Sequence, residues 1–283
     1  MRDERERFAA AVLARDTVCA VASLLDGHGV AIMPIKGVLL QRLVYDDPSE
    51  RAISDVDVLV AERDFDRTRS LLRQSGFRPR LPSPSLIEES FFAPSGLVLD
   101  LHYRLFASGR FRMATDDVLA RATRDTALFG APVLLPDPLD LYAHLVGKIA
   151  SDHVEPGQGL RFDDVARVSR RLGLVASSAA RHLDASGLGR AARYTLPWVA
   201  ELAGDAFAED VLAHLRHDPT GTVLAAGART LLLRLPRRSV LRAIPSHLLN
   251  HSISAAALAV SIASVNRVRY RFAMRHSERG AAT

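Results

Sequence analysis

Cysteine is almost absent from this chain of 283 residues, in which Cys19 stands alone. A single thiol excludes an intramolecular disulfide, and it leaves the ten histidines without the companion thiols of a zinc motif. The chain also has no Walker A loop, no Gly-x-Ser-x-Gly elbow and no Rossmann fingerprint, so the enzyme classes that those motifs define are excluded. The charged start lacks an adjoining apolar core, so no signal peptide is expected and we predict a cytoplasmic protein.

Lysine is the second scarce residue. Of the 37 basic residues only two, Lys36 and Lys148, are lysines, and the other 35 are arginines. Such usage is typical of a GC-rich bacterial genome. The two lysines are candidate functional residues, because a compact ammonium on a flexible stem differs chemically from a guanidinium fork.

Acidic residues are nearly missing from the end of the chain. Residues 229–283 contain ten arginines and one acid, Glu278, whereas residues 1–228 contain 27 basic and 31 acidic residues. A basic tail suits nucleic acid, peripheral contact with an anionic membrane surface, or an acidic partner protein. The alternative is a C-terminal core helix with a solvated basic end. The only aromatic residues of the tail are Tyr270 and Phe272, which argues against a stacking platform for nucleic acid.

The most informative segment is residues 54–60, Ser-Asp-Val-Asp-Val-Leu-Val, in which two acids alternate with branched apolar residues. A period of two is typical of a β-strand, so Asp55 and Asp57 are expected on one face and the valines on the other. Two neighbouring carboxylates repel each other, and a divalent cation removes that conflict. Because hard oxygen ligands suit Mg²⁺, the pair predicts a metal-dependent phosphoryl or nucleotidyl transferase.

A second apolar alternation over residues 97–103 places Asp100 and His102 on one face of another expected strand. If the two strands pair, Asp100 completes a cluster of three carboxylates that holds two Mg²⁺ ions. One ion would activate the attacking oxygen, and the other would neutralise the triphosphate. The alternative is that each acid lies singly at a solvated strand edge. For His102, a packed and hydrogen-bonded role is as good an interpretation as a functional one.

Upstream, an apolar run ends at Lys36-Gly37, and an amphipathic helix is expected to follow. Glycine at a strand-to-helix turn lets backbone amides approach an anion, and a helix N-terminus favours negative charge. We therefore expect Lys36 and Gly37 to bind phosphate. Arg51 and Ser54 flank the acid pair, and each either touches phosphate or serves as a turn residue.

Together these residues resemble the nucleotidyltransferase superfamily that includes DNA polymerase β and the antibiotic nucleotidyltransferases. More narrowly, residues 32–103 resemble a bacterial branch with the pattern Lys-Gly, Tyr-x-x-Pro, Arg-x-x-x-Asp-hydrophobic-Asp and Asp-x-His. The matching positions are Lys36 and Gly37, Tyr45 and Pro48, Arg51, Asp55 and Asp57, and Asp100 and His102. The superfamily more often has Gly-Ser where this chain has Lys-Gly, which is a departure at the triphosphate-binding position.

The resemblance implies roles for the three acids. Asp55 and Asp57 would ligate Mg²⁺ and the nucleoside triphosphate, and Asp100 would be the third carboxylate and the base toward an incoming hydroxyl. Catalysis would come mainly from positioning and charge neutralisation. The acceptor would be a small molecule, a peptide or a protein.

The second lysine lies in a helix that is expected to begin after Pro138. His144 and Lys148 are four residues apart and share a face of it. The narrower family likewise has a His or Lys helix followed by an Arg-x-x-Asp segment, which falls here on Arg161 and Asp164. By that resemblance, this region holds the triphosphate or the second substrate. The alternative is a salt bridge between Lys148 and Asp164.

The predicted fold class is α+β, with a small mixed-sheet nucleotidyltransferase core followed by a mostly helical C-terminal domain. We expect an N-terminal helix over residues 1–30, a catalytic domain over 31–135, a helical domain over 136–228 and a basic helical extension over 229–283.

Three functional hypotheses follow. The first is a Mg²⁺-dependent nucleotidyltransferase that uses a nucleoside triphosphate. The second is a protein of the same fold that binds a nucleotide or other phosphorylated ligand without turnover. The third is an assembly or membrane-surface protein that acts through its basic tail.

Overall fold

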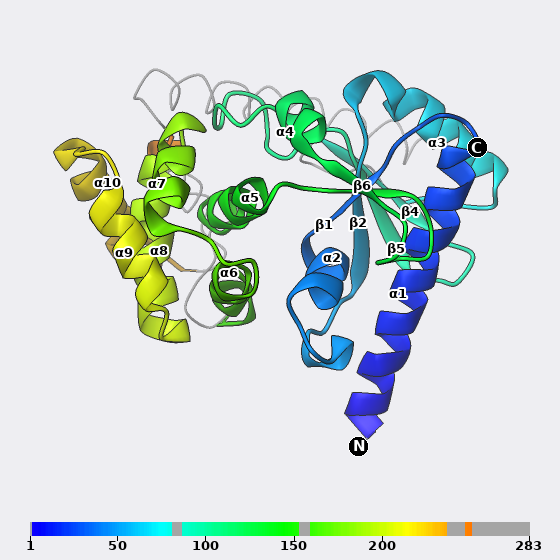
Figure 1. Ribbon diagram of the computed structural model, residues 1–283, viewed down its shortest axis with the longest axis horizontal. Coiled ribbons are helices and arrows are strands. Elements are labelled where there is room, and N and C mark those ends of the chain that lie inside the picture. Colours follow the sequence, from blue (N-terminus) through cyan, green and yellow to red (C-terminus); the bar gives the residue numbers. More distant parts are fainter. Residues whose placement is uncertain (1, 81–86, 153–158, 237–246, 251–283) are drawn as a thin grey trace. The chain divides into compact units, whose positions relative to one another are not determined.

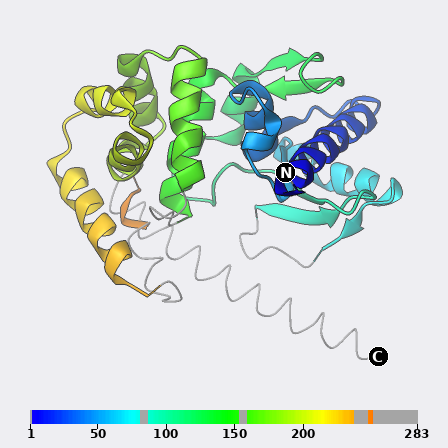
Figure 2. The ribbon, with the colours of Figure 1, turned by 90° about the horizontal axis from the view of Figure 1, so that it is seen from below.

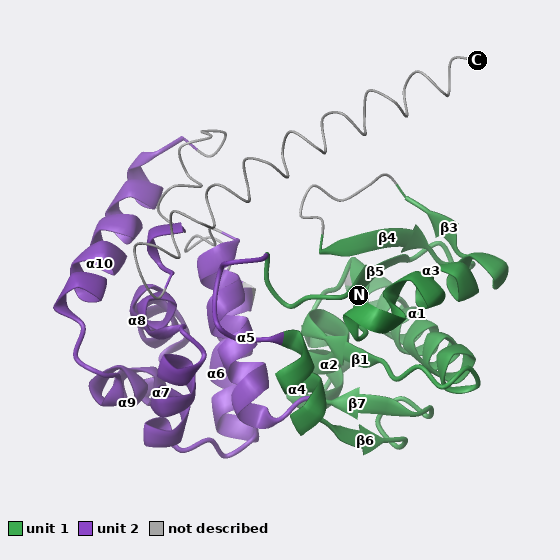
Figure 3. Cartoon of the chain, turned by 90° about the horizontal axis from the view of Figure 1, so that it is seen from above, with its two compact units in different colours: residues 1–107, 115–135, 261–283 green, residues 108–114, 136–260 purple. Residues whose placement is uncertain are grey.

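The computed structural model (Figure 1) describes residues 2–80, 87–152, 159–236 and 247–250. The described residues fall into two compact units (Figure 3), the first within 1–107 and 115–135 and the second within Ser108–Ala114 and residues 136–250. The expected catalytic range, 31–135, therefore loses the short segment Ser108–Ala114. This segment belongs to the helical unit because the amide of Arg112 donates to the carbonyl of Ser186 at 3.0 Å.

A five-stranded sheet in the order β1-β2-β5-β4-β3 forms the centre of the first unit. Its strands are β1 (Met33–Ile35), β2 (Asp55–Leu59), β3 (Arg78–Pro79), β4 (Glu88–Phe92) and β5 (Val98–His102). β2 and β5 run parallel, and the other neighbouring pairs are antiparallel. The expected pairing of these two strands is confirmed, and so is the α+β class with a mixed sheet. A hairpin of β6 (Thr123–Asp125) and β7 (Val133–Leu135) completes the strands described here.

Helices α1 (Arg2–Asp26) and α2 (Lys36–Leu43) pack on this sheet, and α3 (Phe65–Gln74) packs against α1. The buried stripe of α1 includes Ala14, Val18, Val21 and Leu25, which recur at helical spacing. The unit also contains α4 (Thr115–Arg121) and two short 3-10 turns, η1 (Pro48–Glu50) and η2 (Glu62–Asp64). The helices expected at the N-terminus, after Lys36 and before Gly76 are thus confirmed.

One helix among the described residues, α1 from Glu4 to Asp26, is long and apolar enough to cross a membrane by length and composition alone. Core helices pass the same test, and here one stripe of α1 is buried against the sheet while Phe8 and Leu13 are exposed. The location of the protein in the cell therefore stays a prediction.

Apart from Ser108–Ala114, the described part of the second unit consists mostly of helices (Figure 2). Its helices are α5 (Pro138–Ser151), α6 (Gly159–Arg171), α7 (Ala176–Ala185), α8 (Gly189–Ala203), α9 (Ala206–His214) and α10 (Pro219–Arg234). α8 contacts all five others, and its Ala191, Ala192, Leu196 and Val199 are buried. The helical C-terminal part of the predicted fold is confirmed.

The boundary expected at residue 228 falls inside α10, so the change of charge there does not coincide with the end of an element. Most of the basic tail, including the whole of residues 251–283, lies outside the described residues. The predicted contact of this tail with a membrane or an acidic protein stays a prediction.

Replacement of Leu25 by alanine is expected to lower the free energy of unfolding by about 2–5 kcal/mol, because its side chain is fully buried on the packed face of α1. Leu13→Ala on the same helix is the matched control, since this leucine is 43% exposed; its loss is expected to be about 1 kcal/mol or less. Urea unfolding of the full chain, followed by circular dichroism, compares the two. Equal losses would show that the stripe of α1 is not its packing face.

Candidate active site

The pairing of β2 with β5 brings the predicted acids together. In the parallel register Asp57 lies opposite Asp100, and Asp55 precedes Asp57 by two residues on the same face. The intervening apolar residues, Val56, Val58, Leu99 and Leu101, are fully buried on the other face. Burial of this apolar face fixes the register, and the register places the three carboxylates on one side of the sheet.

Asp57 is the most enclosed of the three acids, with 7% of its side chain exposed. Its Oδ1 lies 2.6 Å from Nζ of Lys36 and 2.8 Å from Nε2 of His102. Burial disfavours the charged form, yet Lys36 and His102 hold the pKa of Asp57 well below its ordinary range. The carboxylate is therefore ionised and is neutralised from within the chain.

The backbone directs Lys36 at this carboxylate. Lys36 has a φ of 53°, and among the described residues it is the only non-glycine residue with a positive φ. It follows β1 directly and begins α2, and β1 places Ile35 opposite Asp57. A left-handed backbone costs a side-chain-bearing residue about 1–3 kcal/mol, so the surrounding structure must impose it. Such residues cluster at functional sites.

Gly37 has a packing role beside this lysine. An added Cβ would lie 2.8 Å from Nη1 of Arg51 and 2.9 Å from Cγ2 of Ile53, so only glycine lets these side chains approach. The left-handed residue of the Lys-Gly pair is the lysine, and the glycine provides space for Arg51. Gln41 holds the same loop, because its Nε2 donates to the carbonyls of Pro48 and Arg51 at 2.9 and 2.5 Å.

Asp55 and Asp100 have no lysine or arginine at ion-pair distance among the described residues. Burial and the negative charge of Asp57 raise the pKa of Asp55, although Ser54 donates to its Oδ1 at 3.2 Å. Burial also raises the pKa of Asp100, against a hydrogen bond from Ser90. Oδ1 of Asp100 is buried and accepts no hydrogen bond from the described residues. Lys36 and Arg51 act on Asp55 as nearby charges, but burial outweighs them, so the carboxylates on this side of the site are only partly compensated.

The site includes two residues that were not predicted from the sequence, Glu88 and Ser90. β4 pairs with β5 and sets Glu88 opposite His102 and Ser90 opposite Asp100. Oε2 of Glu88 lies 3.1 Å from Nδ1 of His102, so this buried histidine lies between two carboxylates. Residues 88–92 read Glu-Glu-Ser-Phe-Phe and do not alternate, so no periodic signal in the sequence indicates this strand.

The donor set decides whether the site fits Mg²⁺. In the part of the chain that the structure describes, no three His, Cys, Asp or Glu side chains form a ready-made metal site, so the expected three-acid cluster is not preformed. Oδ1 of Asp57 is already bound by the ammonium of Lys36 and the ring of His102. Mg²⁺, however, is usually held by one or two carboxylates together with substrate phosphates and water. Asp55 and Asp100 fit that mode, and Oδ1 of Asp100, which accepts no hydrogen bond within the described ranges, is an oxygen available for it.

Lys148 and Arg161 form a separate cluster in the second unit. Both bind Asp152, at 2.9 Å from Nζ of Lys148 and 2.8 Å from Nη1 of Arg161. Burial opposes the charge, but these cations hold the pKa of Asp152 below its ordinary range. The alternative prediction, a salt bridge between Lys148 and Asp164, is wrong. Lys148 instead pairs with Asp152, the C-cap residue of its own helix, and Asp164 is buried. A role of this region in holding the triphosphate stays a prediction.

The sequence model of a family described as "Uncharacterised nucleotidyltransferase" matches residues 3–204. The chain belongs to this nucleotidyltransferase family. The match runs from α1 to the end of α8, so it includes the acids on β2 and β5 as well as most of the helical unit. Family membership supports a role in nucleotidyl transfer.

Solved structures with some similarity are distant. An antigenic nucleotidyltransferase-like protein from Paracoccidioides brasiliensis is 16% identical, covers 72% of this chain over 94% of its own, and has a TM-score of 0.44. The Thermotoga maritima CCA-adding enzyme, solved in complex with tRNA, is 12% identical, with 88% and 80% coverage and a TM-score of 0.27. These scores carry no argument about substrates. No match to the chain was found among curated proteins.

Lys36→Met is expected to destabilise the protein by about 2 kcal/mol or more, because it removes a cation from a buried carboxylate. Lys148→Met is the matched control: this lysine has similar exposure, and Arg161 still neutralises its partner, so the loss should be about 1 kcal/mol or less. In a double-mutant cycle, Asp57→Asn should reduce the cost of Lys36→Met. Urea unfolding gives the four free energies. Strict additivity would contradict the pairing.

Proposed function

We propose that this protein is a Mg²⁺-dependent nucleotidyltransferase that moves a nucleoside monophosphate from a nucleoside triphosphate to a small-molecule, peptide or protein acceptor. The observation that carries the proposal is the register of β2 and β5, which sets Asp57 opposite Asp100 with Asp55 on the same face. Membership of the nucleotidyltransferase family supports the same class of reaction.

The three acids would hold Mg²⁺, which when bound neutralises the triphosphate and the departing pyrophosphate. Asp55 and Asp100 would contribute carboxylates that are only partly compensated, whereas Asp57 would contribute one that Lys36 already neutralises. Lys36 is 22% exposed on a flexible stem, which supports a move of its ammonium from Asp57 to an incoming phosphate oxygen. His102 and Glu88 keep Asp57 in position while the lysine turns to the phosphate.

The transfer itself needs a base for the acceptor. The acceptor oxygen attacks the α-phosphorus, the bond from that phosphorus to the bridging oxygen breaks, and pyrophosphate leaves. Asp100 takes the proton of the acceptor hydroxyl, a role that suits a carboxylate whose pKa is raised and whose Oδ1 has no hydrogen bond among the described residues.

A second candidate is a protein that binds the nucleotide without turnover. The observation that favours it is the closed contact of Asp57 with Lys36 and His102, which leaves one of the three acids already satisfied. In such a protein the lysine would not leave Asp57, and Mg²⁺ with a triphosphate would bind without release of pyrophosphate.

The test is pyrophosphate release and transfer of an α-labelled phosphate from each ribonucleoside triphosphate, with Mg²⁺ and a bacterial small-molecule extract as the acceptor source. Asp57→Asn and Asp100→Asn are each expected to lower the rate by about a hundredfold or more. Glu89→Gln is the matched control, since Glu89 lies on β4 but binds Arg69 and Arg73 away from the acids; its rate should stay within about twofold of wild type.

Three outcomes divide the candidates. A loss in the two aspartate variants alone supports transfer by this site. Metal-dependent binding of a triphosphate without any transfer would favour the binding protein. A rate that is equal in Asp57→Asn and Glu89→Gln would contradict both assignments of the site.

A further inference from the structure

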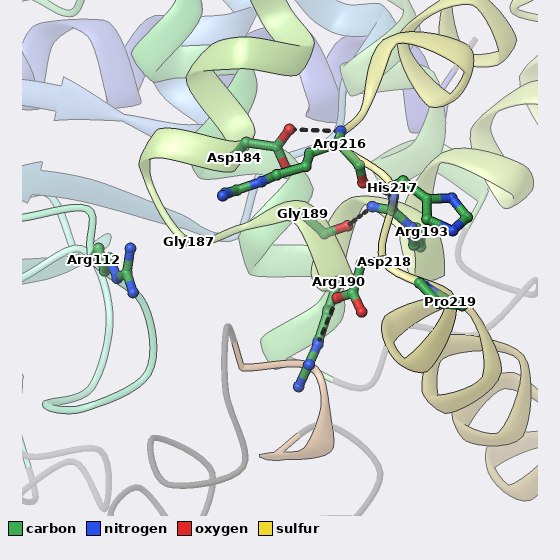
Figure 4. A pocket seen from close by; sticks show the side chains of 10 residues that line it. All are labelled: Arg112, Asp184, Gly187, Gly189, Arg190, Arg193, Arg216, His217, Asp218 and Pro219. Carbon is green, nitrogen blue, oxygen red and sulfur yellow. Dashed lines mark hydrogen bonds and ion pairs between the residues drawn. The ribbon is translucent and has the colours of Figure 1, made fainter.

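The helical unit contains a pocket of about 360 Å³ whose lining is rich in arginine (Figure 4). We call it the arginine pocket, and define it by Arg112, Arg190, Arg193, Arg216 and His217. All five residues belong to the second unit, and none has a role in the site formed by β2 and β5. The pocket therefore calls for an explanation of its own.

The four arginines fall into two pairs. Arg190 donates to Oδ2 of Asp218 at 3.0 Å, and Arg193 donates to the carbonyls of Gly189 and Arg216, so these two guanidinium groups are fixed in place. The guanidinium groups of Arg112 and Arg216 have neither a hydrogen bond nor an ion pair with any residue that the structure describes. Both side chains are exposed, and in Figure 4 that of Arg216 extends toward the side on which Arg112 lies.

The two acids in the lining do not cancel these charges. Asp218 caps α10 by accepting from the amide of Gly221 at 2.8 Å, and it is bound by Arg190. Asp184 accepts from the backbone amide of Arg216 at 2.8 Å (Figure 4). Each carboxylate thus has an internal function, and the lining keeps more positive than negative groups.

The N-terminus of α8 adds to the positive potential of the arginine pocket. α8 begins at Gly189, in the lining of the pocket, and its N-cap residue Leu188 makes no side-chain cap. The first amides of a helix point toward its N-terminus and favour an anion there. The free arginines and this helix start therefore act on the same space.

A less polar pocket of about 600 Å³ adjoins the arginine pocket and shares Arg193, His217 and Asp218 with it. The rest of its lining is largely apolar, with Pro197, Leu212, Ala213, Leu215 and Ala226. A ligand that fits both would combine an anionic group with an organic body. Volumes of this size are typical of sites for small molecules.

We propose that the two adjoining pockets bind an organic phosphate, with its phosphate on the arginine pocket and its body along Leu212 and Ala226. Arginine binds phosphate through paired, charge-assisted hydrogen bonds, and two guanidinium groups are available for them. The site goes beyond the proposed function, which places the nucleoside triphosphate at the acids of the first unit.

The test is calorimetric titration of phenyl phosphate into the full chain in the presence of EDTA, where metal-dependent binding at the acids does not contribute. Arg112→Gln/Arg216→Gln is expected to weaken binding roughly tenfold or more. Arg181→Gln/Arg234→Gln is the matched control: it removes two exposed arginines of the same unit outside the pocket, and affinity should stay within about twofold. Circular dichroism melts confirm that both variants are folded.

A second measurement tests the organic body. The wild type should prefer phenyl phosphate over inorganic phosphate several-fold, and Leu212→Gln should remove this preference without weakening inorganic phosphate. Asp55→Asn/Asp57→Asn should bind phenyl phosphate as the wild type does, so failure of the transferase proposal would leave this result intact.

Three results would overturn the proposal. The first is no binding of phenyl phosphate by the wild type. The second is equal weakening in the two double-arginine variants, which would reduce the effect to general charge. The third is displacement of phenyl phosphate by a short single-stranded RNA at a lower concentration than by inorganic pyrophosphate, which would assign the pocket to a polymer.

Discussion

The contact on which the first unit depends is the one that Asp57 makes with Lys36 and His102. A carboxylate this enclosed is stable only with a cation and donors beside it. β2 supplies the acid, β5 supplies the histidine, and α2 supplies the lysine as its left-handed first residue. Three elements are therefore held in one arrangement by a single charged cluster, with Glu88 of β4 behind the histidine.

This cluster gives the three acids different tasks. Asp57 is kept ionised by its partners, while burial raises the pKa of Asp55 and of Asp100, which have no such partners among the described residues. A buried carboxylate oxygen without a donor, such as Oδ1 of Asp100 among the described residues, lowers stability and therefore indicates a functional role. In the proposed function, Asp55 and Asp100 would bind a cation that enters with its substrate, while Asp57 would hold β2, β5 and Lys36 together.

The sequence predicted what depends on local periodicity. Alternation of acids with valines identified β2, and the same pattern identified β5, so the face that carries Asp55, Asp57 and Asp100 followed before any contact was known. Local periodicity does not predict contacts between residues far apart in the chain. Nothing near Lys36 in the sequence indicates that Asp57 is its partner. The unexpected segment Ser108–Ala114 joins the helical unit through similar long-range bonds, and Lys148 has a nearer acid than the one expected. Ion pairs form where tertiary packing brings side chains together, and spacing alone does not encode that.

The central claim is that Asp55 and Asp100 form an open carboxylate pair that binds metal together with a nucleotide. It is tested most directly by calorimetric titration of nucleoside triphosphates, with and without Mg²⁺, into wild type and Asp55→Asn/Asp100→Asn. The account predicts tight binding to the wild type only with Mg²⁺, and loss of that metal dependence in the double variant. Triphosphate binding that is as strong without Mg²⁺, or that is unchanged in the double variant, would contradict it.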